Sequence, residues 1–129
     1  MTYHLDLGKS MEDYLEAIFI LHKRKGNVRS VDVATYMNFS KPSICHAVKE
    51  LRKKGYLTTS DDSALCLTEK GMTLARQVYD RHSFFTNHLI SIGVSPDVAE
   101  QDACEIEHVI SEESFQKLKK SMEAMEREG

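Results

Sequence analysis

The sequence has no tryptophan, only two prolines and six glycines, and three cysteines among 129 residues. An odd cysteine count without framework spacing excludes a small disulfide-stapled domain and indicates a reducing compartment, so we expect a cytoplasmic protein. No apolar run approaches the roughly 20 residues that a membrane-spanning helix needs. Residues 1–8 also lack the apolar region and cleavage motif of a secretory signal, so no membrane partner is expected.

Charge is distributed unevenly along a chain that is 41% hydrophobic, 29% charged and therefore globular. The formal net charge is −3, but residues 1–94 carry 13 Lys and Arg against 10 Asp and Glu, whereas residues 95–129 carry 4 against 10. Residues 41–54 contain five basic side chains and a single acidic one, Glu50. A local basic patch in an acidic protein indicates nucleic-acid binding, although a solvated helix end would look similar.

Hydrophobic periodicity and capping residues predict six helices and one hairpin. Ser10, Ser30, Ser40, Thr68 and Ser111 are the expected N-caps, with Asp13 as the capping partner of Ser10. The expected helices run from Met11 to about Lys25, Val31 to Met37, Ser40 to Gly55, Glu69 to Ser91, Ser95 to about Ile110, and from Ser111 with an apolar stripe of Phe115, Leu118, Met122 and Met125. The expected strands are Tyr56–Thr59 and Ala64–Leu67, joined by the turn 60–63.

Helix, short helix, tight turn, basic helix and hairpin is the order of elements in a winged helix-turn-helix, whose third helix enters the major groove of DNA. The fold class is therefore mainly α: an N-terminal winged helix-turn-helix followed by a helical domain. The expected DNA-binding residues lie at the start of the third helix or opposite its apolar stripe: Ser40, Lys41, Pro42, Ser43, His46, Lys49 and Lys53. Other interpretations stay open, since Ser40 can act only as a cap, Lys53 can complement the helix dipole and His46 can be an idle surface imidazole.

Cys104, Glu107 and His108 stand at positions i, i+3 and i+4 of the fifth predicted helix. If the segment is helical, the three side chains leave from one face and can share a ligand. Thiolate, carboxylate and imidazole together suit a borderline transition metal such as Zn²⁺, Fe²⁺, Co²⁺, Ni²⁺ or Mn²⁺. The alternative is a solvated acidic helix with one half-buried cysteine.

Five segments together resemble the metal-dependent repressors related to diphtheria toxin repressor and the manganese transport regulator. They are residues 10–16, 40–44, 67–71, 78–82 and 104–108. The resemblance covers nearly all of residues 8–125, and the chain looks like the short two-domain form that lacks an SH3-like extension. It implies a DNA-binding domain at 1–75 and a metal-binding and dimerisation domain at 76–129.

The resemblance also implies a function and a ligand set. The function is that of a transcriptional repressor that binds double-stranded operator DNA as a homodimer when loaded with Mn²⁺ or Fe²⁺, and that controls metal-homeostasis genes. Zn²⁺, Co²⁺ and Ni²⁺ are further candidate ions, and no small organic substrate is implied. The implied metal ligands are Asp13, Glu16, His82, Cys104, Glu107 and His108.

The ligand set mixes the two types within this family. Asp13 resembles the manganese-type members, which have aspartate there, whereas Cys104 resembles the iron-type members. The ancillary site of the iron type is incomplete, because Thr86 occupies the position of its carboxylate and Glu100 the position of its second histidine. Carboxylate oxygens favour Mn²⁺, while a thiolate favours Fe²⁺, Co²⁺ or Zn²⁺, so the residues leave the identity of the metal open.

Two alternatives come from other classes of function. The first is a winged-helix regulator whose acidic half only dimerises and senses no metal. The second is an enzyme with Cys104 as the nucleophile and His82 or His108 as the base. The sequence disfavours an enzyme, since it has no glycine-rich phosphate loop and no nucleophile elbow.

Overall fold

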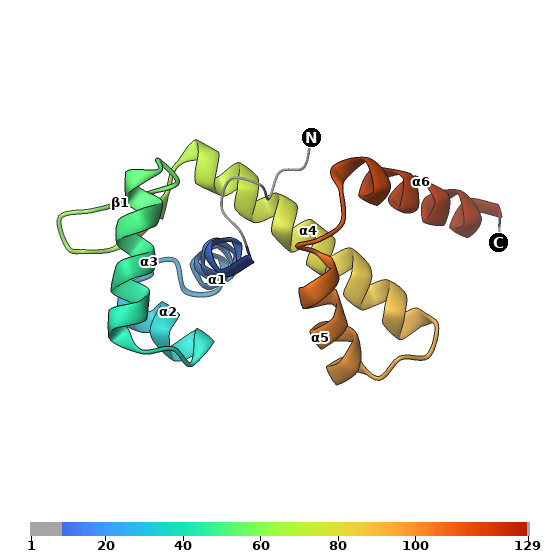
Figure 1. The fold of residues 1–129 in the computed structure, drawn as a ribbon, viewed down its shortest axis with the longest axis horizontal. Helices are drawn as coiled ribbons and strands as arrows, with labels where there is room; N and C mark the ends of the chain where they lie inside the picture. The colour runs from blue at the N-terminus through green and yellow to red at the C-terminus, as the bar shows by residue number, and fades with distance from the viewer. Residues whose placement is uncertain (1–8, 129) are drawn as a thin grey trace. The chain divides into compact units, whose positions relative to one another are not determined.

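The computed structural model describes residues 9–128. Helices dominate this part of the chain, and one antiparallel hairpin interrupts them, which confirms the predicted fold class (Figure 1). The elements are α1 (Lys9–Lys25), α2 (Ser30–Met37), α3 (Lys41–Lys53), β1 (Leu57–Thr59), β2 (Leu65–Leu67), α4 (Glu69–Ser91), α5 (Pro96–Ile106) and α6 (Glu112–Glu128). Among the described residues, no helix combines the length and apolarity needed to cross a membrane.

The described residues form two compact units, which we call the N-terminal unit (9–77) and the C-terminal unit (78–128). Helix α4 contributes its first residues to the N-terminal unit and the rest to the C-terminal unit. These units are defined by contacts within the structure. The expected boundary between two domains at residues 75 and 76 stays a prediction.

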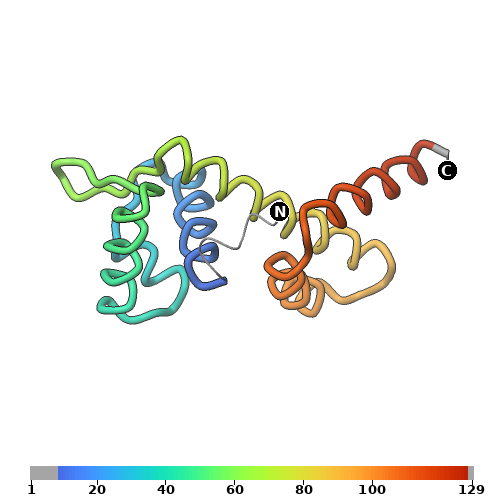
Figure 2. Tube along the Cα trace, turned by 45° about the horizontal axis from the view of Figure 1, so that its top comes forward, coloured from blue at the N-terminus to red at the C-terminus, as the bar shows by residue number. Residues whose placement is uncertain are grey.

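The N-terminal unit packs α1, α2 and α3 around a small apolar core and extends the hairpin from it (Figure 2). The side chains that fill this core are buried, among them Leu15, Ile18, Val33, Ile44 and Leu51. The hairpin pairs Leu57 with Leu67 and Thr59 with Leu65. The backbone N–H of Leu65 also donates to the carbonyl of Val28 at 2.7 Å, which anchors the hairpin to the segment before α2.

The start of α3 agrees with its sequence signals. Ser40 has extended backbone angles, and its hydroxyl accepts a hydrogen bond from the N–H of Ser43 at 3.3 Å. Pro42 lies in the first turn, where its missing N–H is not needed. Asn38 takes the left-handed conformation (φ 58°) that closes the turn between α2 and α3. The tight turn and the serine cap therefore present the start of α3 to solvent.

Two of the predicted caps are wrong. Ser10 lies inside α1 (Lys9–Lys25), and the Asp13 carboxylate accepts from the Lys9 ammonium at 3.2 Å. Ser30 lies inside α2, and Arg29 occupies the cap position, where its backbone N–H donates to the Asp32 carboxylate at 2.9 Å. At α2 a first-turn carboxylate thus accepts the backbone N–H that precedes the helix, whereas at α1 the Asp13 carboxylate contacts a lysine side chain.

Helix α4 starts directly after the hairpin. The Thr68 hydroxyl accepts from the N–H of Gly71 at 3.1 Å, as predicted for a cap, and donates to the carbonyl of Gly55 at 2.7 Å. Gly71 must remain small, since a Cβ atom there would lie 2.0 Å from the Tyr56 carbonyl oxygen. The segment 67–71 therefore joins α4 tightly to the hairpin.

The C-terminal unit has its own aromatic core between α4, α5 and α6. Phe85, Ala103 and Phe115 are buried together, and Phe84 packs edge-on against Phe115 with ring centroids 5.5 Å apart. On α6 only part of the predicted apolar stripe is covered, because Phe115 is 2% exposed whereas Met125 is 61% exposed. This unit therefore has a filled core and an uncovered apolar surface.

Candidate metal centre

Helix α5 ends earlier than its sequence pattern predicts. Its last residue is Ile106 instead of about Ile110, so Glu107 is the C-cap and His108 lies in the following turn. Two backbone hydrogen bonds there span three residues instead of four. The N–H of His108 donates to the carbonyl of Glu105 at 3.4 Å, and the N–H of Val109 donates to the carbonyl of Ile106 at 3.1 Å. β-branched side chains at 106, 109 and 110 also weaken the preference for a helix.

The three residues at this helix end still converge after the helical spacing is lost. Cys104, Glu107 and His108 each offer one ligand atom, and these atoms all lie within 4.8 Å of one another. Glu107 and His108 are buried, and Cys104 is partly buried. The end of α5 therefore presents a thiol, a carboxylate and an imidazole to one point.

Glu107 is at the centre of this cluster. Its carboxylate is fully buried, with Oε2 3.1 Å from His82 Nδ1 and Oε1 3.2 Å from His108 Nε2. His82 comes from α4, so α4 and the end of α5 contribute to the same cluster. A buried carboxylate is costly unless it is paired with a cation or with hydrogen-bond donors, and two imidazoles provide that pairing only in suitable protonation states.

His82 also borders a shallow depression on the same unit. The depression is lined by His82, Asp97, Glu100, Gln101 and Cys104, and His82 Nε2 lies 3.9 Å from Glu100 Oε1. Glu100 is therefore near the cluster, but 3.9 Å is longer than a hydrogen bond. Thr86, the other residue at an ancillary-site position, has a buried hydroxyl with no hydrogen-bond partner among residues 9–128.

The donor set of the C-terminal unit fits a divalent transition metal. Cys104, Glu107, His108 and His82 supply sulfur, oxygen and nitrogen ligands, and borderline ions such as Zn²⁺, Fe²⁺ and Co²⁺ accept this mixture. A cation beside the buried Glu107 would also neutralise its charge. The chemistry of the residues therefore agrees with a metal ion at the end of α5.

Two further candidate ligands belong to the N-terminal unit. Asp13 and Glu16 stand three residues apart on α1, so their side chains are neighbours on the helix surface. Glu16 is buried, and Asp13 is in contact with Lys9. Asp13 and Glu16 are therefore the candidate ligands that the N-terminal unit contributes.

All seven candidate DNA-binding residues are exposed on α3 or at its start: Ser40, Lys41, Pro42, Ser43, His46, Lys49 and Lys53. The opposite side of α3 carries the buried Ile44, Ala47 and Leu51. The predicted stripe therefore faces the core, apart from Val48, which is only partly buried. This arrangement leaves the basic side of α3 free to contact a nucleic acid.

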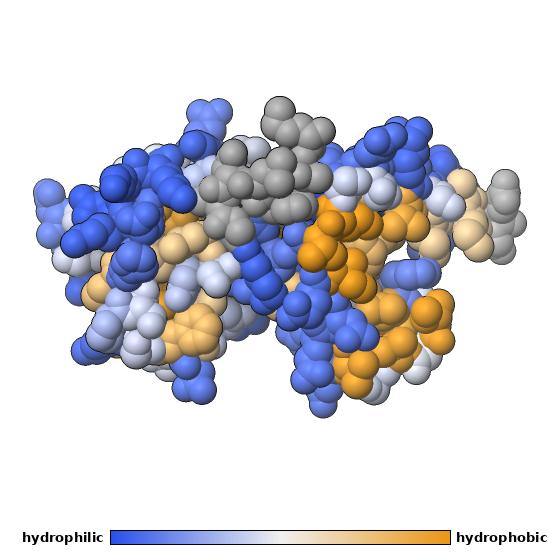
Figure 3. Space-filling view, viewed as in Figure 1, coloured by the Kyte–Doolittle hydropathy of each residue, from blue (hydrophilic) through white to orange (hydrophobic). Residues whose placement is uncertain are grey.

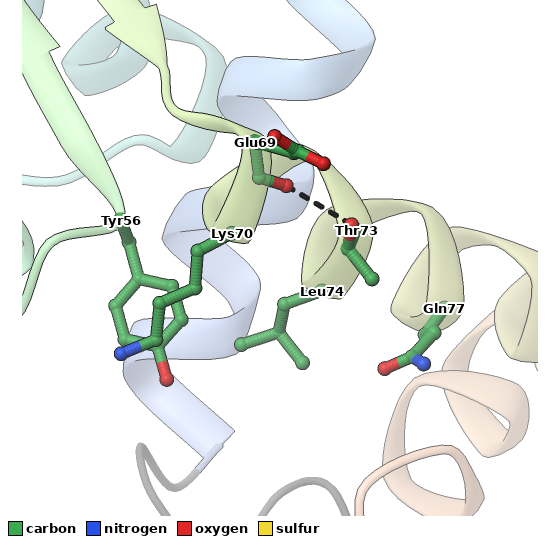
Figure 4. A pocket seen from close by; sticks show the side chains of 6 residues that line it. All are labelled: Tyr56, Glu69, Lys70, Thr73, Leu74 and Gln77. Carbon is green, nitrogen blue, oxygen red and sulfur yellow. Dashed lines mark hydrogen bonds between the residues drawn. The ribbon is translucent and has the colours of Figure 1, made fainter.

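A second hollow on the N-terminal unit has a different chemistry. It lies beside the hairpin and the start of α4, and its described lining is Tyr56, Glu69, Lys70, Thr73, Leu74 and Gln77 (Figure 4). The Lys70 ammonium lies 4.3 Å from the centre of the Tyr56 ring and donates to the Lys54 carbonyl at 3.1 Å. Among the described lining residues there is one carboxylate and no cysteine or histidine, so this hollow does not resemble the metal cluster.

A winged helix-turn-helix unit and a helical unit with a thiol, carboxylate and imidazole cluster define a metal-dependent DNA-binding regulator. Residues 6–65 match the N-terminal DNA binding domain of the iron dependent repressors, and residues 68–128 match their metal binding and dimerisation domain. The chain belongs to the iron dependent repressor family, which confirms the resemblance found in the sequence.

Named relatives agree with this assignment. The chain is 34% identical over 105 residues to the transcriptional regulator MntR of Escherichia coli O6:H1, covering 81% of this chain and 68% of that protein. It is 33% identical over 117 residues to the HTH-type transcriptional regulator MntR of Lysinibacillus sphaericus, covering 91% of this chain and 84% of that protein.

The fold also matches a solved structure, that of the manganese regulator SloR. The TM-score is 0.79 at 26% identity, covering 88% of this chain and 53% of the SloR chain. The chain therefore spans about half the length of that solved regulator.

Proposed function

We propose that this protein is a metal-dependent transcriptional repressor that binds operator DNA as a homodimer and controls genes of metal homeostasis. The observation that carries the proposal is the convergence of Cys104, Glu107 and His108 at the end of α5, in a chain whose other unit is a winged helix-turn-helix. The membership of the chain in the iron dependent repressor family supports the same function.

The proposed metal ligands come from three helices and the turn after α5. His82 on α4 and Cys104, Glu107 and His108 around the end of α5 form the part contributed by the C-terminal unit. Asp13 and Glu16 on α1 are proposed to complete the set. Their spacing of three residues on one helix and the resemblance to the family's ligand pattern support this assignment.

The charges of these side chains suggest how metal would control DNA binding. In the proposed site, the carboxylates Asp13 and Glu16 of α1 and Glu107 at the end of α5 would repel one another without a counter-ion. A bound divalent cation would supply the positive charge that neutralises them. Because α1 packs against α3, fixing α1 relative to α5 would also fix the recognition helix of each subunit.

A dimer would convert that fixed geometry into specificity. The two recognition helices of a dimer can enter successive major grooves only if they are spaced by one helical turn of DNA, about 34 Å. The C-terminal unit exposes apolar side chains suited to a dimer interface, and Figure 3 shows apolar surface over this unit. They include Ile92, Val98, Val109, Leu118 and Met125.

We propose Mn²⁺ or Fe²⁺ as the physiological metal. The solved neighbour SloR is named a manganese regulator, and the carboxylates Asp13 and Glu16 agree with a hard ion. Cys104 agrees better with Fe²⁺, or with Zn²⁺ and Co²⁺ in vitro.

A selection of bound duplexes from a random pool, run in each metal and in chelator, tests the function and identifies the operator. Selection of the same duplexes in chelator and in metal would favour a regulator that does not sense metal.

Lys49→Ala tests the assignment of α3 as the DNA-binding helix. Lys49 is exposed on α3, on the side away from Ile44 and Leu51. If its ammonium neutralises one phosphate, the variant should bind all duplexes more weakly and lower the slope of log affinity against log salt by about 0.9. Titrations at several salt concentrations measure the slope. A double Ser43→Ala, His46→Ala variant should change sequence preference with little change in slope, and an unaltered slope for Lys49→Ala would remove Lys49 from the interface.

A further inference from the structure

Arg81 is a completely buried arginine next to the candidate metal ligand His82 on α4. Its guanidinium Nη1 donates to the carbonyl of Ile110 at 2.6 Å and to that of Glu107 at 3.4 Å. Its Nη2 donates to Glu112 Oε1 at 2.6 Å. One side chain therefore reaches both ends of the turn 107–110 and the first residue of α6.

This turn is the segment that carries two of the candidate ligands. Helix α5 ends at Ile106, so the last carbonyl groups of the helix and turn need donors from elsewhere. Arg81 supplies donors to two of these carbonyls, at Glu107 and Ile110. The backbone that orients the side chains of Glu107 and His108 is thus fixed by Arg81.

The charge of Arg81 is balanced within the same unit. Burial raises the pKa of Glu112, but hydrogen bonds from Arg81 and Gln116, together with the charge of Arg81, outweigh it and keep that pKa below its ordinary value. Glu112 is therefore ionised at neutral pH and faces the guanidinium. The guanidinium also lies 5.0 Å from the centre of the Phe115 ring, which holds it against the aromatic core.

A neighbouring ion pair provides a comparison within the same unit. Lys119 on α6 donates to Asp80 on α4 at 2.9 Å, so this pair also joins α4 to α6. It is partly exposed, and among the described residues its one ion-pair contact joins Lys119 to Asp80 and does not involve the turn 107–110. Loss of this pair would therefore weaken the link between α4 and α6 without removing the donors that Arg81 gives to the turn.

We propose that Arg81 is a positioning residue of the metal centre, which holds the turn 107–110 so that Glu107 and His108 meet Cys104 before a metal binds. This proposal rests on the proposed function, because it assigns a role in the same metal site. Preorganised ligands bind more tightly, since a site that is formed only part of the time binds with an affinity reduced by that fraction. Arg81 is thus predicted to set metal affinity without touching the ion.

Arg81→Lys tests the proposal while keeping the positive charge. Lysine lacks the planar fork that reaches two carbonyls and a carboxylate at once. We expect the variant to bind Co²⁺ about 10–100-fold more weakly, the range found when side chains that support metal ligands are changed. Because Cys104, Glu107 and His108 remain, the thiolate-to-cobalt absorption band should reach the parent intensity at saturation. Glu112→Gln, which removes only the counter-charge, should give a smaller loss in the same direction.

Cobalt titrations of the full chain, read by absorption, give the dissociation constant, and denaturant unfolding of the metal-free proteins gives their stability. Asp80→Asn is the matched control and should keep the parent dissociation constant. A merely structural role of Arg81 would lower the stability of the metal-free protein and leave the dissociation constant of Arg81→Lys equal to that of Asp80→Asn, which would overturn the proposal. If Arg81→Lys does not fold, Glu112→Gln decides by the same comparison. Failure of the parent itself to give a band that depends on Cys104 would overturn both this proposal and the proposed function.

Discussion

Glu107→Gln should remove the stabilisation that divalent metal gives to this protein. Glu107 is fully buried between His82 and His108, and it is the proposed acidic ligand at the centre of the cluster. Glutamine keeps the size of the side chain but lacks its negative charge, so the site loses both a strong ligand and the charge that attracts a cation. A ligand that binds only the folded state stabilises it by about 2.7 kcal/mol at a concentration one hundred times its dissociation constant.

Denaturant unfolding with Mn²⁺ and with chelator measures this effect. The parent should gain stability with metal, whereas Glu107→Gln should show the same midpoint in both conditions. Asp102→Asn is the control, since Asp102 is an exposed carboxylate on the same helix, and this variant should respond as the parent does. An equal gain for Glu107→Gln and the parent would show that Glu107 does not bind the metal.

Cys104→Glu and Asp13→Met should change the metal preference in opposite directions. Replacing the thiol with a carboxylate makes the ligand set richer in oxygen, which should favour Mn²⁺ over Zn²⁺, Fe²⁺ and Co²⁺. Replacing Asp13 with a thioether makes it softer, which should favour the other ions over Mn²⁺. Zinc with Cys104 and a histidine tends to four ligands, whereas manganese accepts six, so coordination number should reinforce both trends.

Activation of DNA binding by each metal, compared at matched occupancy, measures this preference. Matched occupancy is essential, because raw affinity rises from Mn²⁺ toward Zn²⁺ at almost any site. An unchanged ranking of metals in both variants would mean that Cys104 and Asp13 do not determine selectivity, and would argue against a direct contact of these side chains with the ion.

Helix ends show which parts of the fold could be predicted from the sequence. Ser40, Thr68 and Ser111 were identified as caps from their position before an apolar period, and each accepts the expected backbone hydrogen bond. Ser10 and Ser30 precede similar periods but lie inside their helices. At α2 the Asp32 carboxylate accepts the backbone N–H of Arg29 instead, and a capping pattern alone does not identify the acceptor that is used.

The candidate metal site could be predicted in its residues but not in its backbone. The helical spacing of Cys104, Glu107 and His108 predicts that these side chains lie together, and they do, although α5 ends before the last two residues. The convergence survives because the turn remains tight, with backbone bonds spanning three residues. The role of Arg81 could not be predicted, since its partners, two backbone carbonyls and the Glu112 carboxylate, lie 26, 29 and 31 residues away and leave no periodic signal in the sequence.

The most direct test of the central claim is the affinity of the dimer for its selected duplex in saturating Mn²⁺ and in chelator, measured at one salt concentration. Allosteric coupling energies of about 1–3 kcal/mol correspond to about 5–150-fold in affinity. We predict that metal tightens binding of the parent within this range, and that Glu107→Gln binds equally weakly in both conditions. Equal affinity of the parent in metal and in chelator would contradict the account and leave a winged-helix regulator that does not sense metal.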